Sequence, residues 1–204
     1  MHGVHNNETY EQFIERHRPK KTTDNCYTPP DIYDQIVEYC KRLKWYNGEQ
    51  IVRPFYPGGD YENAEYPEGS IVLDNPPFSI LSKIVKFYND NNIKYILFAP
   101  ALTCMSYIKY GSIAFLVNDV MYENGAKVKT ALLTNIEKGK IYTAQLPIKV
   151  SKSRAPAEIP DDWITAGRLF KAGRLYDREL DVNDYEFVRK NPQGRKLYGG
   201  ALKK

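Results

Sequence analysis

Two uninterrupted apolar runs, separated by a helix-like stretch, are the clearest pattern in the sequence. The runs are SIVLDN at 70–75 and IKYILFAP at 93–100, and continuous apolar runs of this length are typical of strands buried on both faces of a parallel sheet. Between them, SILSKIVKFYNDN at 79–91 places its large apolar side chains on one side of a helix. The three stretches therefore predict a strand, a helix and a second strand joined as a right-handed parallel crossover.

Helical spacing also precedes these runs. TYEQFIERH predicts a short first helix over 9–17. YTPPDIYDQIVEYCKRL predicts a second helix, with Thr28 as its N-cap and Pro29 at its first helical position. After this helix we expect a short strand and then a loop rich in glycine and proline.

The C-terminal half predicts further strands and then an irregular extension. GSIAFLV is typical of a third strand, and Asn124-Gly125 between two strand-like runs predicts a β-hairpin. Beyond residue 150 we expect a linker, one short helix and a mobile tail. We therefore predict the α/β class, with a domain at 1–150 and a basic, partly flexible extension at 151–204.

Composition places the chain among soluble globular proteins. Of its 204 residues, 42% are apolar and 26% are charged. No run approaches the ~20 apolar residues of a membrane helix, and the N-terminal segment lacks a secretory pattern, so we expect a cytoplasmic protein without a membrane partner.

The net charge of +4 lies wholly in residues 151–204, which hold 12 basic and 8 acidic residues. A basic segment of this kind is either a nucleic-acid-facing surface or a solvated tail, and the charge by itself favours the tail.

The cysteines and histidines indicate neither disulfides nor a metal site. The three cysteines are odd in number and widely spaced, which fits reduced core residues: Cys26, Cys40 and Cys104. All three histidines lie near the N-terminus without the spacing of metal ligands, so we expect no bound metal.

The first apolar run ends in Asn75, Pro76, Pro77 and Phe78, four residues unsuited to continuing a strand. The two prolines remove ladder donors and stiffen the chain. Ligands of open α/β sheets bind outside the carboxyl ends of the strands, where this tetrapeptide stands. An amide oxygen and proline carbonyls are acceptors, and a stiff loop makes Phe78 a platform. The tetrapeptide therefore predicts a site for a planar group with an exocyclic NH2, such as a flipped base. The structural alternative is that the tetrapeptide only ends the strand with a rigid turn and that Phe78 packs in the core.

The tetrapeptide resembles the catalytic (Asp/Asn/Ser)-Pro-Pro-(Tyr/Phe/Trp) motif of the S-adenosylmethionine-dependent amino-methyltransferases. Its Asn and Phe form is typical of the enzymes that act on adenine N6 in DNA. YTPPDIYDQI is similar to the Thr-Pro segment that precedes the cofactor motif in phage-type and EcoRI-type adenine methyltransferases, and NPPFS and TALLTNIE are similar to stretches of the EcoRI methylase-like group. The resemblance covers residues 22 to about 137.

This resemblance implies an architecture, a cofactor and a substrate. The fold would be a reduced class I methyltransferase-like (Rossmann-like) sheet with flanking helices and a C-terminal β-hairpin. The cofactor would be S-adenosylmethionine. The partner would be DNA with a flipped adenine, in a phage or mobile-element setting.

The resemblance also implies roles for individual residues. The Asn75 side chain and the Pro76 carbonyl would accept hydrogen bonds from the adenine amine, Pro77 would stiffen the loop, and Phe78 would stack on the base. Two groups of residues would contact the cofactor, one at its methionine end and one in place of the family's glycine-rich loop: Tyr27, Thr28 and Pro29, and Pro54, Phe55, Gly58, Gly59 and Asp60. The N-terminus of the second helix would suit the cofactor carboxylate, and the glycines would let the backbone approach it.

The cofactor loop departs from the family pattern. Arg53 stands where the family has an acidic residue, the glycines are adjacent rather than alternating, and Asp60, Glu62 and Glu65 are the candidates for the acid that holds the cofactor ribose. We expect Arg53 to pair with Asp60 or with Asp74, because an unpaired guanidinium would repel a sulfonium. Two alternatives stay open. One is a catalytically silent relative that binds nucleic acid or a partner protein, and the other is a methyltransferase that acts on RNA or on a protein amide.

Overall fold

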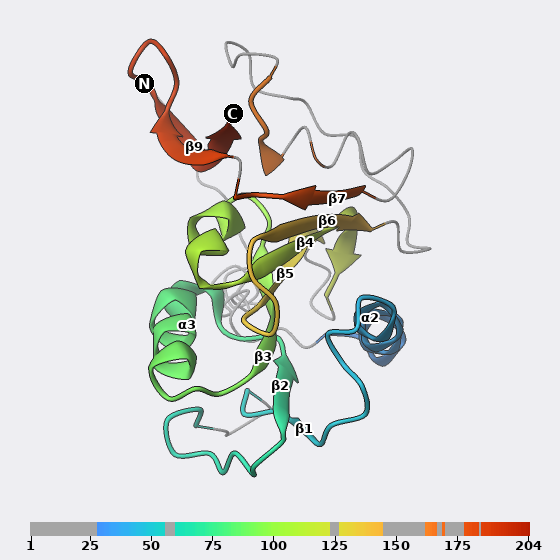
Figure 1. Cartoon of the computed structure of the whole chain (residues 1–204). Helices are drawn as coiled ribbons and strands as arrows, with labels where there is room; N and C mark the ends of the chain where they lie inside the picture. Colours follow the sequence, from blue (N-terminus) through green and yellow to red (C-terminus); the bar gives the residue numbers. More distant parts are fainter. Residues whose placement is uncertain are drawn as a thin grey trace, which may run out of the picture.

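A mixed sheet with helices on both faces forms the body of the protein (Figure 1). The computed structural model describes residues 28–55, 60–122, 127–144, 162–166, 169, 178–183 and 185–204. Helix α2 (Pro30–Arg42) lies on one face of the sheet, and helices α3 (Leu81–Asp90) and η3 (Cys104–Tyr110) lie on the other. The expected helix over 9–17 and the expected domain boundary at residue 150 lie outside the described residues.

Seven strands form this sheet. The first three strands in the sequence run parallel to one another. The bounds of the seven strands are β1 (Ile51–Val52), β2 (Ile71–Asp74), β3 (Tyr95–Pro100), β4 (Ser112–Met121), β5 (Lys127–Thr134), β6 (Lys140–Ala144) and β7 (Arg178–Asp181). Their order is β1-β2-β3-β5-β4-β6-β7. β1, β2 and β3 pair in parallel, as do β4 and β6, and the remaining pairs are antiparallel. The predicted β2–α3–β3 crossover and the predicted β4–β5 hairpin are therefore confirmed.

The two apolar runs are buried on both faces, as their patterns predict. Along β2, Val72 contributes to the hydrophobic cluster on the α3 face, while Ile71 and Leu73 contribute to the cluster on the α2 face. β3 alternates in the same way, with Leu97 facing α3 and Phe98 facing α2. Each strand thus supplies apolar side chains to two cores, which is why its sequence is continuous rather than alternating.

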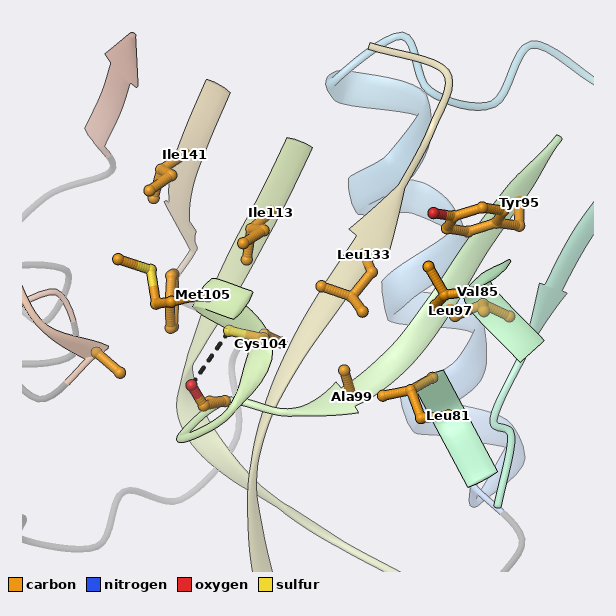
Figure 2. Packing of buried hydrophobic residues seen from close by; sticks show 14 of the residues in the cluster. Leu81, Val85, Tyr95, Leu97, Ala99, Cys104, Met105, Ile113, Leu133 and Ile141 are labelled. Carbon is orange, nitrogen blue, oxygen red and sulfur yellow. Dashed lines mark hydrogen bonds between the residues drawn. The ribbon is translucent and has the colours of Figure 1, made fainter. Parts of the chain in front are cut away.

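Figure 2 shows the cluster on the α3 face. Side chains from α3, from the strands β2 to β6 and from η3 meet there, with α2 behind the sheet. Cys104, at the start of η3, is fully buried, and its thiol donates a hydrogen bond to the carbonyl of Ala101 at 3.1 Å. The helix η3 was not expected from the sequence, because its seven residues are held by this tertiary packing rather than by a helical apolar repeat.

Helix α2 begins one residue later than the sequence predicts. Pro30 occupies its first helical position and Pro29 is the N-cap, with an extended ψ of 143°. A residue before proline is driven out of the α region, so Pro29 cannot be helical while Pro30 follows it. The expectation of Thr28 as N-cap is therefore wrong by one position.

The described residues from 178 onward form strands that the sequence analysis does not predict. β7 pairs with β6 at the edge of the main sheet, and β8 (Glu186–Lys190) and β9 (Lys196–Lys203) form an antiparallel hairpin. Leu202 in β9 is 1% exposed and belongs to the α3-face cluster. Its backbone also pairs with that of Ile164 through two hydrogen bonds of 2.8 and 2.9 Å. No helix among the described residues is long and apolar enough to cross a bilayer.

Two of the cysteines are buried thiols without disulfides, as predicted. Burial raises the pKa of Cys40 to about 12 and raises the pKa of Cys104 as well. At pH 8 we therefore expect neither thiol to react with a disulfide reagent at the rate of an exposed cysteine, because less than about 0.1% of Cys40 is thiolate. The measurement is thiol titration of Cys26→Ser, native and in denaturant. Rapid native release of one equivalent or more would contradict the burial of these thiols.

Candidate functional site

The loops that follow β1 and β2 meet at the carboxyl edge of the sheet. Val52 at the end of β1 is in register with Val72, so the chain leaves β1 beside the middle of β2. The chain then leaves β2 directly into the Asn75–Phe78 tetrapeptide. The sequence-predicted catalytic residues and the start of the predicted cofactor loop therefore lie on neighbouring strands.

Asp74, the last residue of β2, joins these two loops. Asp74 is 2% exposed, and its carboxylate accepts three hydrogen bonds. Oδ1 accepts from Arg53 Nε at 3.3 Å and from the backbone N–H of Asn75 at 2.9 Å, and Oδ2 accepts from the backbone N–H of Phe55 at 3.0 Å. One buried carboxylate thus fixes the exit of β1 and the first residue of the tetrapeptide relative to each other.

The expected pairing of Arg53 is confirmed, with Asp74 as its partner. The guanidinium also stacks over the ring of Tyr33, with its central carbon 4.2 Å from the ring centroid. The Tyr33 hydroxyl donates to the carbonyl of Leu73 at 2.8 Å. Because burial raises the pKa of Tyr33 above its ordinary value, this hydroxyl stays protonated and keeps donating. These contacts hold the first turn of α2 against the end of β2.

The tetrapeptide forms a stiff step between β2 and α3. Asn75 is half-buried, Pro76 is buried, and Pro77 is half-buried. Phe78 opens the short helix η2 (Phe78–Ile80), which runs directly into α3. Its ring packs at the margin of the α2-face cluster and remains half-exposed. Phe78 therefore has one side against the core and keeps accessible surface.

The predicted cofactor residues have different surroundings. Tyr27, Gly58 and Gly59 lie outside the described residues, while Pro54 is buried and Phe55 is half-buried. Thr28, just before α2, is 6% exposed, and its Oγ1 has no hydrogen-bond partner within the part of the chain that the structure describes. A buried hydroxyl without a partner costs free energy, so Thr28 is a candidate donor to a ligand at this edge.

The N-terminus of α2 offers fewer backbone donors than a helix normally does. Pro29 and Pro30 have no N–H, and the N–H groups of Ile32 and Tyr33 both bond to the carbonyl of Pro29, at 3.1 and 2.9 Å. Asp31 supplies the remaining donor of the first turn and also places a carboxylate there. An anionic ligand is therefore held less strongly at this end than the general rule for helix N-termini implies.

An aromatic cluster fixes the segment that follows the cofactor loop. The ring of Tyr61 lies 5.8 Å from that of Phe55 and 5.4 Å from that of Phe87, centroid to centroid. The Tyr66 hydroxyl donates to the carbonyl of Tyr61 and contacts the hydroxyl of Tyr88. The loop is thereby held against α3, a placement that sequence reasoning missed because tyrosines in an irregular stretch carry no periodic signal.

Asp60 is exposed and takes part in a local turn. Its carboxylate accepts from the backbone N–H of Glu62 at 2.9 Å and from the Asn63 side chain at 2.8 Å. The hydrogen bond from Asn63 holds the pKa of Asp60 below its usual value. Asp60 thus stays ionised near the β1 exit.

A hollow of about 460 Å³ lies at the opposite, amino edge of the sheet. Its walls come from the segment before β2 and from the connection between α3 and β3, including Tyr66, Glu68, Asn92 and Lys94. The tetrapeptide does not line it. No group of acidic, histidine or cysteine side chains among the described residues could hold a metal ion.

Comparison with known proteins assigns this chain to no family. No protein-family model and no curated protein matches this chain. A similar solved structure is a chain from Vibrio vulnificus YJ016 assigned as a modification subunit of a type I restriction enzyme, with 10% sequence identity and a TM-score of 0.41. The match covers 93% of this chain and 62% of that chain, so this chain spans less than two thirds of that protein. At this identity and TM-score the match supports no conclusion about family or function.

Proposed function

We propose that the chain transfers a methyl group from S-adenosylmethionine to the N6 amine of adenine in DNA. The observation that carries this proposal is the position of the Asn75–Phe78 tetrapeptide. It is stiff and partly accessible, it lies at the carboxyl edge of the sheet, and it is tied through Asp74 to the loop after β1. Ligands of open α/β sheets bind at this edge.

The four residues would act on the target amine by hydrogen bonding and stacking. The Asn75 side chain and the Pro76 carbonyl would accept hydrogen bonds from the two amine protons, which raises electron density on the nitrogen. Phe78 would stack on the base with its accessible face. S-adenosylmethionine would supply the methyl group on a sulfonium sulfur, and the amine proton would then pass to water.

Two features support binding of this cofactor at the β1 exit. The Thr28 hydroxyl, which has no hydrogen-bond partner among the described residues, is a donor for a carboxylate. Arg53, the residue that departs most from the family pattern, has its charge offset by Asp74. At ~4 Å and an effective dielectric of about 20, an uncompensated guanidinium would repel a sulfonium by about 4 kcal/mol. Because Arg53 is paired with Asp74, its charge is compensated and this repulsion is reduced.

One observation favours a second candidate, a catalytically silent relative that binds nucleic acid or a partner protein. The prolines at the start of α2 leave few backbone donors for a cofactor carboxylate. The two candidates differ in whether the purified protein binds S-adenosylmethionine.

The deciding experiment is incubation of the full chain with labelled S-adenosylmethionine and mixed-sequence DNA, followed by nucleoside analysis. We expect label in N6-methyldeoxyadenosine. Parallel incubations with RNA and with protein extract test the other methyl acceptors. Micromolar cofactor binding without label in any acceptor, or no cofactor binding, would overturn the proposal, and the latter would favour the silent relative.

Phe78 provides a prediction that separates base stacking from core packing. Phe78→Leu keeps apolar volume against the α2-face cluster but removes the flat ring, so we expect nearly parental stability and a KM for DNA raised by ~10-fold, since one stacked base contributes ~1–3 kcal/mol. Phe78→Tyr keeps the ring and should retain activity. Melting curves, cofactor titration and steady-state kinetics are the measurements.

Phe78→Ala serves as the comparison. Because the ring is only half-buried, we expect a loss of about 1–2 kcal/mol of stability, below the ~3–5 kcal/mol of a core phenylalanine. Unchanged DNA kinetics in Phe78→Leu, together with a core-sized loss in Phe78→Ala, would show that the ring belongs to the core.

A further inference from the structure

The β8–β9 hairpin holds the positive charge of the protein. Residues 186–204 contain six basic side chains and one acidic one, a net charge of +5, while the whole chain carries +4. The rest of the chain therefore has a net charge of −1. The basic excess is thus confined to one ordered element.

The charges within the hairpin are arranged differently at its two ends. At the open end, Glu186 is in register with Lys203, and their side chains form an ion pair at 2.7 Å. Near the turn, Lys190 is in register with Lys196, and both are exposed. Like charges directly opposite each other destabilise a β-ladder. The pair near the turn is therefore unfavourable for the isolated protein and becomes favourable when an anion lies across it.

Two arginines flank this lysine pair. Arg189 and Arg195 are both exposed, and the guanidinium of Arg189 lies 5.5 Å from the centroid of the Phe187 ring. A planar guanidinium held on a ring is pre-oriented for the bidentate hydrogen bonds that phosphate accepts. We call Arg189, Lys190, Arg195 and Lys196 the hairpin tip.

The turn that joins the strands is fixed by hydrogen bonds. Asn191 is buried, its Oδ1 accepts from the backbone N–H of Arg195 at 2.8 Å, and its backbone N–H donates to the carbonyl of Arg195 at 2.9 Å. Gly194, at φ +78°, donates to the carbonyl of Asn191. The tip is thereby presented by a defined turn, so less conformational entropy is lost on binding.

The hairpin is anchored on the edge of the sheet that carries the tetrapeptide. At Gly199, with φ +84°, a Cβ atom would stand 1.5 Å from the carbonyl oxygen of Leu102, so only glycine allows this backbone approach. Leu102 lies just past the end of β3, which is the parallel neighbour of β2. In Figure 1 the arrow of β2 points toward the end of the molecule at which β9 lies.

We propose that the hairpin tip binds the backbone phosphates of the duplex DNA that carries the target base. The hairpin contacts the chain just past the carboxyl end of β3, so a duplex held by its tip would extend across the edge that carries Asn75. The tetrapeptide itself offers acceptors and a ring but no cation. The choice of DNA as the source of the phosphates rests on the proposed function. Contacts of this kind position a protein on nucleic acid without reading sequence.

The test is equilibrium binding of the full chain to a labelled duplex of ~30 base pairs at several salt concentrations, without cofactor. In the tip variant all four basic residues are replaced, as Arg189→Gln, Lys190→Gln, Arg195→Gln and Lys196→Gln. The control variant removes four exposed lysines that lie outside the hairpin, as Lys44→Gln, Lys86→Gln, Lys94→Gln and Lys138→Gln. Both variants lose the same charge, so a general electrostatic effect would weaken both alike.

We expect the tip variant to lose affinity by about 100-fold or more near 0.1 M salt and to reduce the slope of log affinity against log salt by ~3–4, since each phosphate contact contributes about 0.9. The control should stay within about threefold of the parent. Equal losses in the two variants, or parental affinity in the tip variant, would overturn the inference.

A single substitution guards against a tip variant that fails to fold. Lys196→Glu places a carboxylate opposite Lys190 and should raise or preserve the melting temperature, while it lowers DNA affinity by at least ~10-fold. A merely structural hairpin would not lose DNA affinity while its melting temperature is kept or raised. A duplex RNA of the same sequence that binds more tightly through the tip would overturn the choice of DNA.

The outcome is separable from that of the proposed function. Tip-dependent DNA binding without methyl transfer would leave the hairpin inference standing and defeat the enzyme. Methyl transfer that is undiminished in the tip variant would leave the enzyme standing and defeat the hairpin inference. A parent chain that binds no duplex DNA near 0.1 M salt overturns the hairpin inference in either case.

Discussion

Replacing Asn75 with alanine is expected to lower the rate of methyl transfer by at least ~100-fold while leaving the melting temperature nearly unchanged. The side chain is the acceptor proposed to act on the amine, and losing one positioned polar group at a reacting centre costs a factor of this size. The fold should tolerate the change, because the bond that Asn75 gives to Asp74 comes from its backbone N–H and persists in alanine. The measurements are kcat, KM and a melting curve.

Asn91→Ala is the matched control for this experiment. Asn91 is exposed and lies just past the end of α3, toward the opposite edge of the sheet, so the same substitution there should leave methyl transfer within about twofold of the parent. An Asn75→Ala protein that melts normally and methylates at the parental rate would end the assignment of this residue.

Replacing Asp74 with alanine is expected to destabilise the protein by about 3 kcal/mol. The substitution leaves the backbone N–H groups of Phe55 and Asn75 without their acceptor in a buried setting, and each such loss costs ~1–3 kcal/mol. Loss of the ion pair with Arg53 adds less to this cost, because the Arg53 side chain is 35% exposed and can turn toward water. Denaturant unfolding measures the change in free energy.

The partner substitution distinguishes backbone fixation from charge pairing. Arg53→Met keeps the two backbone hydrogen bonds to Asp74, so we expect it to cost about 1 kcal/mol, clearly less than Asp74→Ala. Asp34→Ala, an exposed aspartate on α2, should stay within about 0.5 kcal/mol of the parent. If Arg53→Met proved as costly as Asp74→Ala, the ion pair and not the loop fixation would be the main contribution of Asp74.

The central crossover could be predicted because its signal is local. β2 and β3 are continuous apolar runs and α3 has one apolar face, so hydrophobic spacing alone determines strand, helix and strand in that order. The start of α2 was misplaced by one residue because the effect of Pro30 on Pro29 outweighs the preference for proline at the first helical position. The tetrapeptide was found for the same local reason: prolines directly after a buried strand are visible without a fold.

Elements that depend on distant partners could not be found in this way. β7 has only four residues, and it pairs with β6 across a long stretch of chain. The β8–β9 hairpin lacks a regular apolar alternation, and its glycines are typical of an irregular segment, whereas in the structure Gly199 packs against Leu102. Short strands gain most of their stability from the sheet that they join, so their own sequence carries little signal.

The sequence by itself therefore determined the α/β class, the parallel crossover and the stiff Asn75-Pro76-Pro77-Phe78 loop, because each follows from the spacing of residues that are close in the chain. Only the tertiary structure decided which acidic side chain pairs with Arg53 and where the basic residues lie. The pairing of Arg53 with Asp74 joins residues 21 positions apart. The net charge of the C-terminal segment was visible in the composition, but its placement beside the carboxyl edge of β3 depends on a backbone contact between Gly199 and Leu102 that no local pattern encodes.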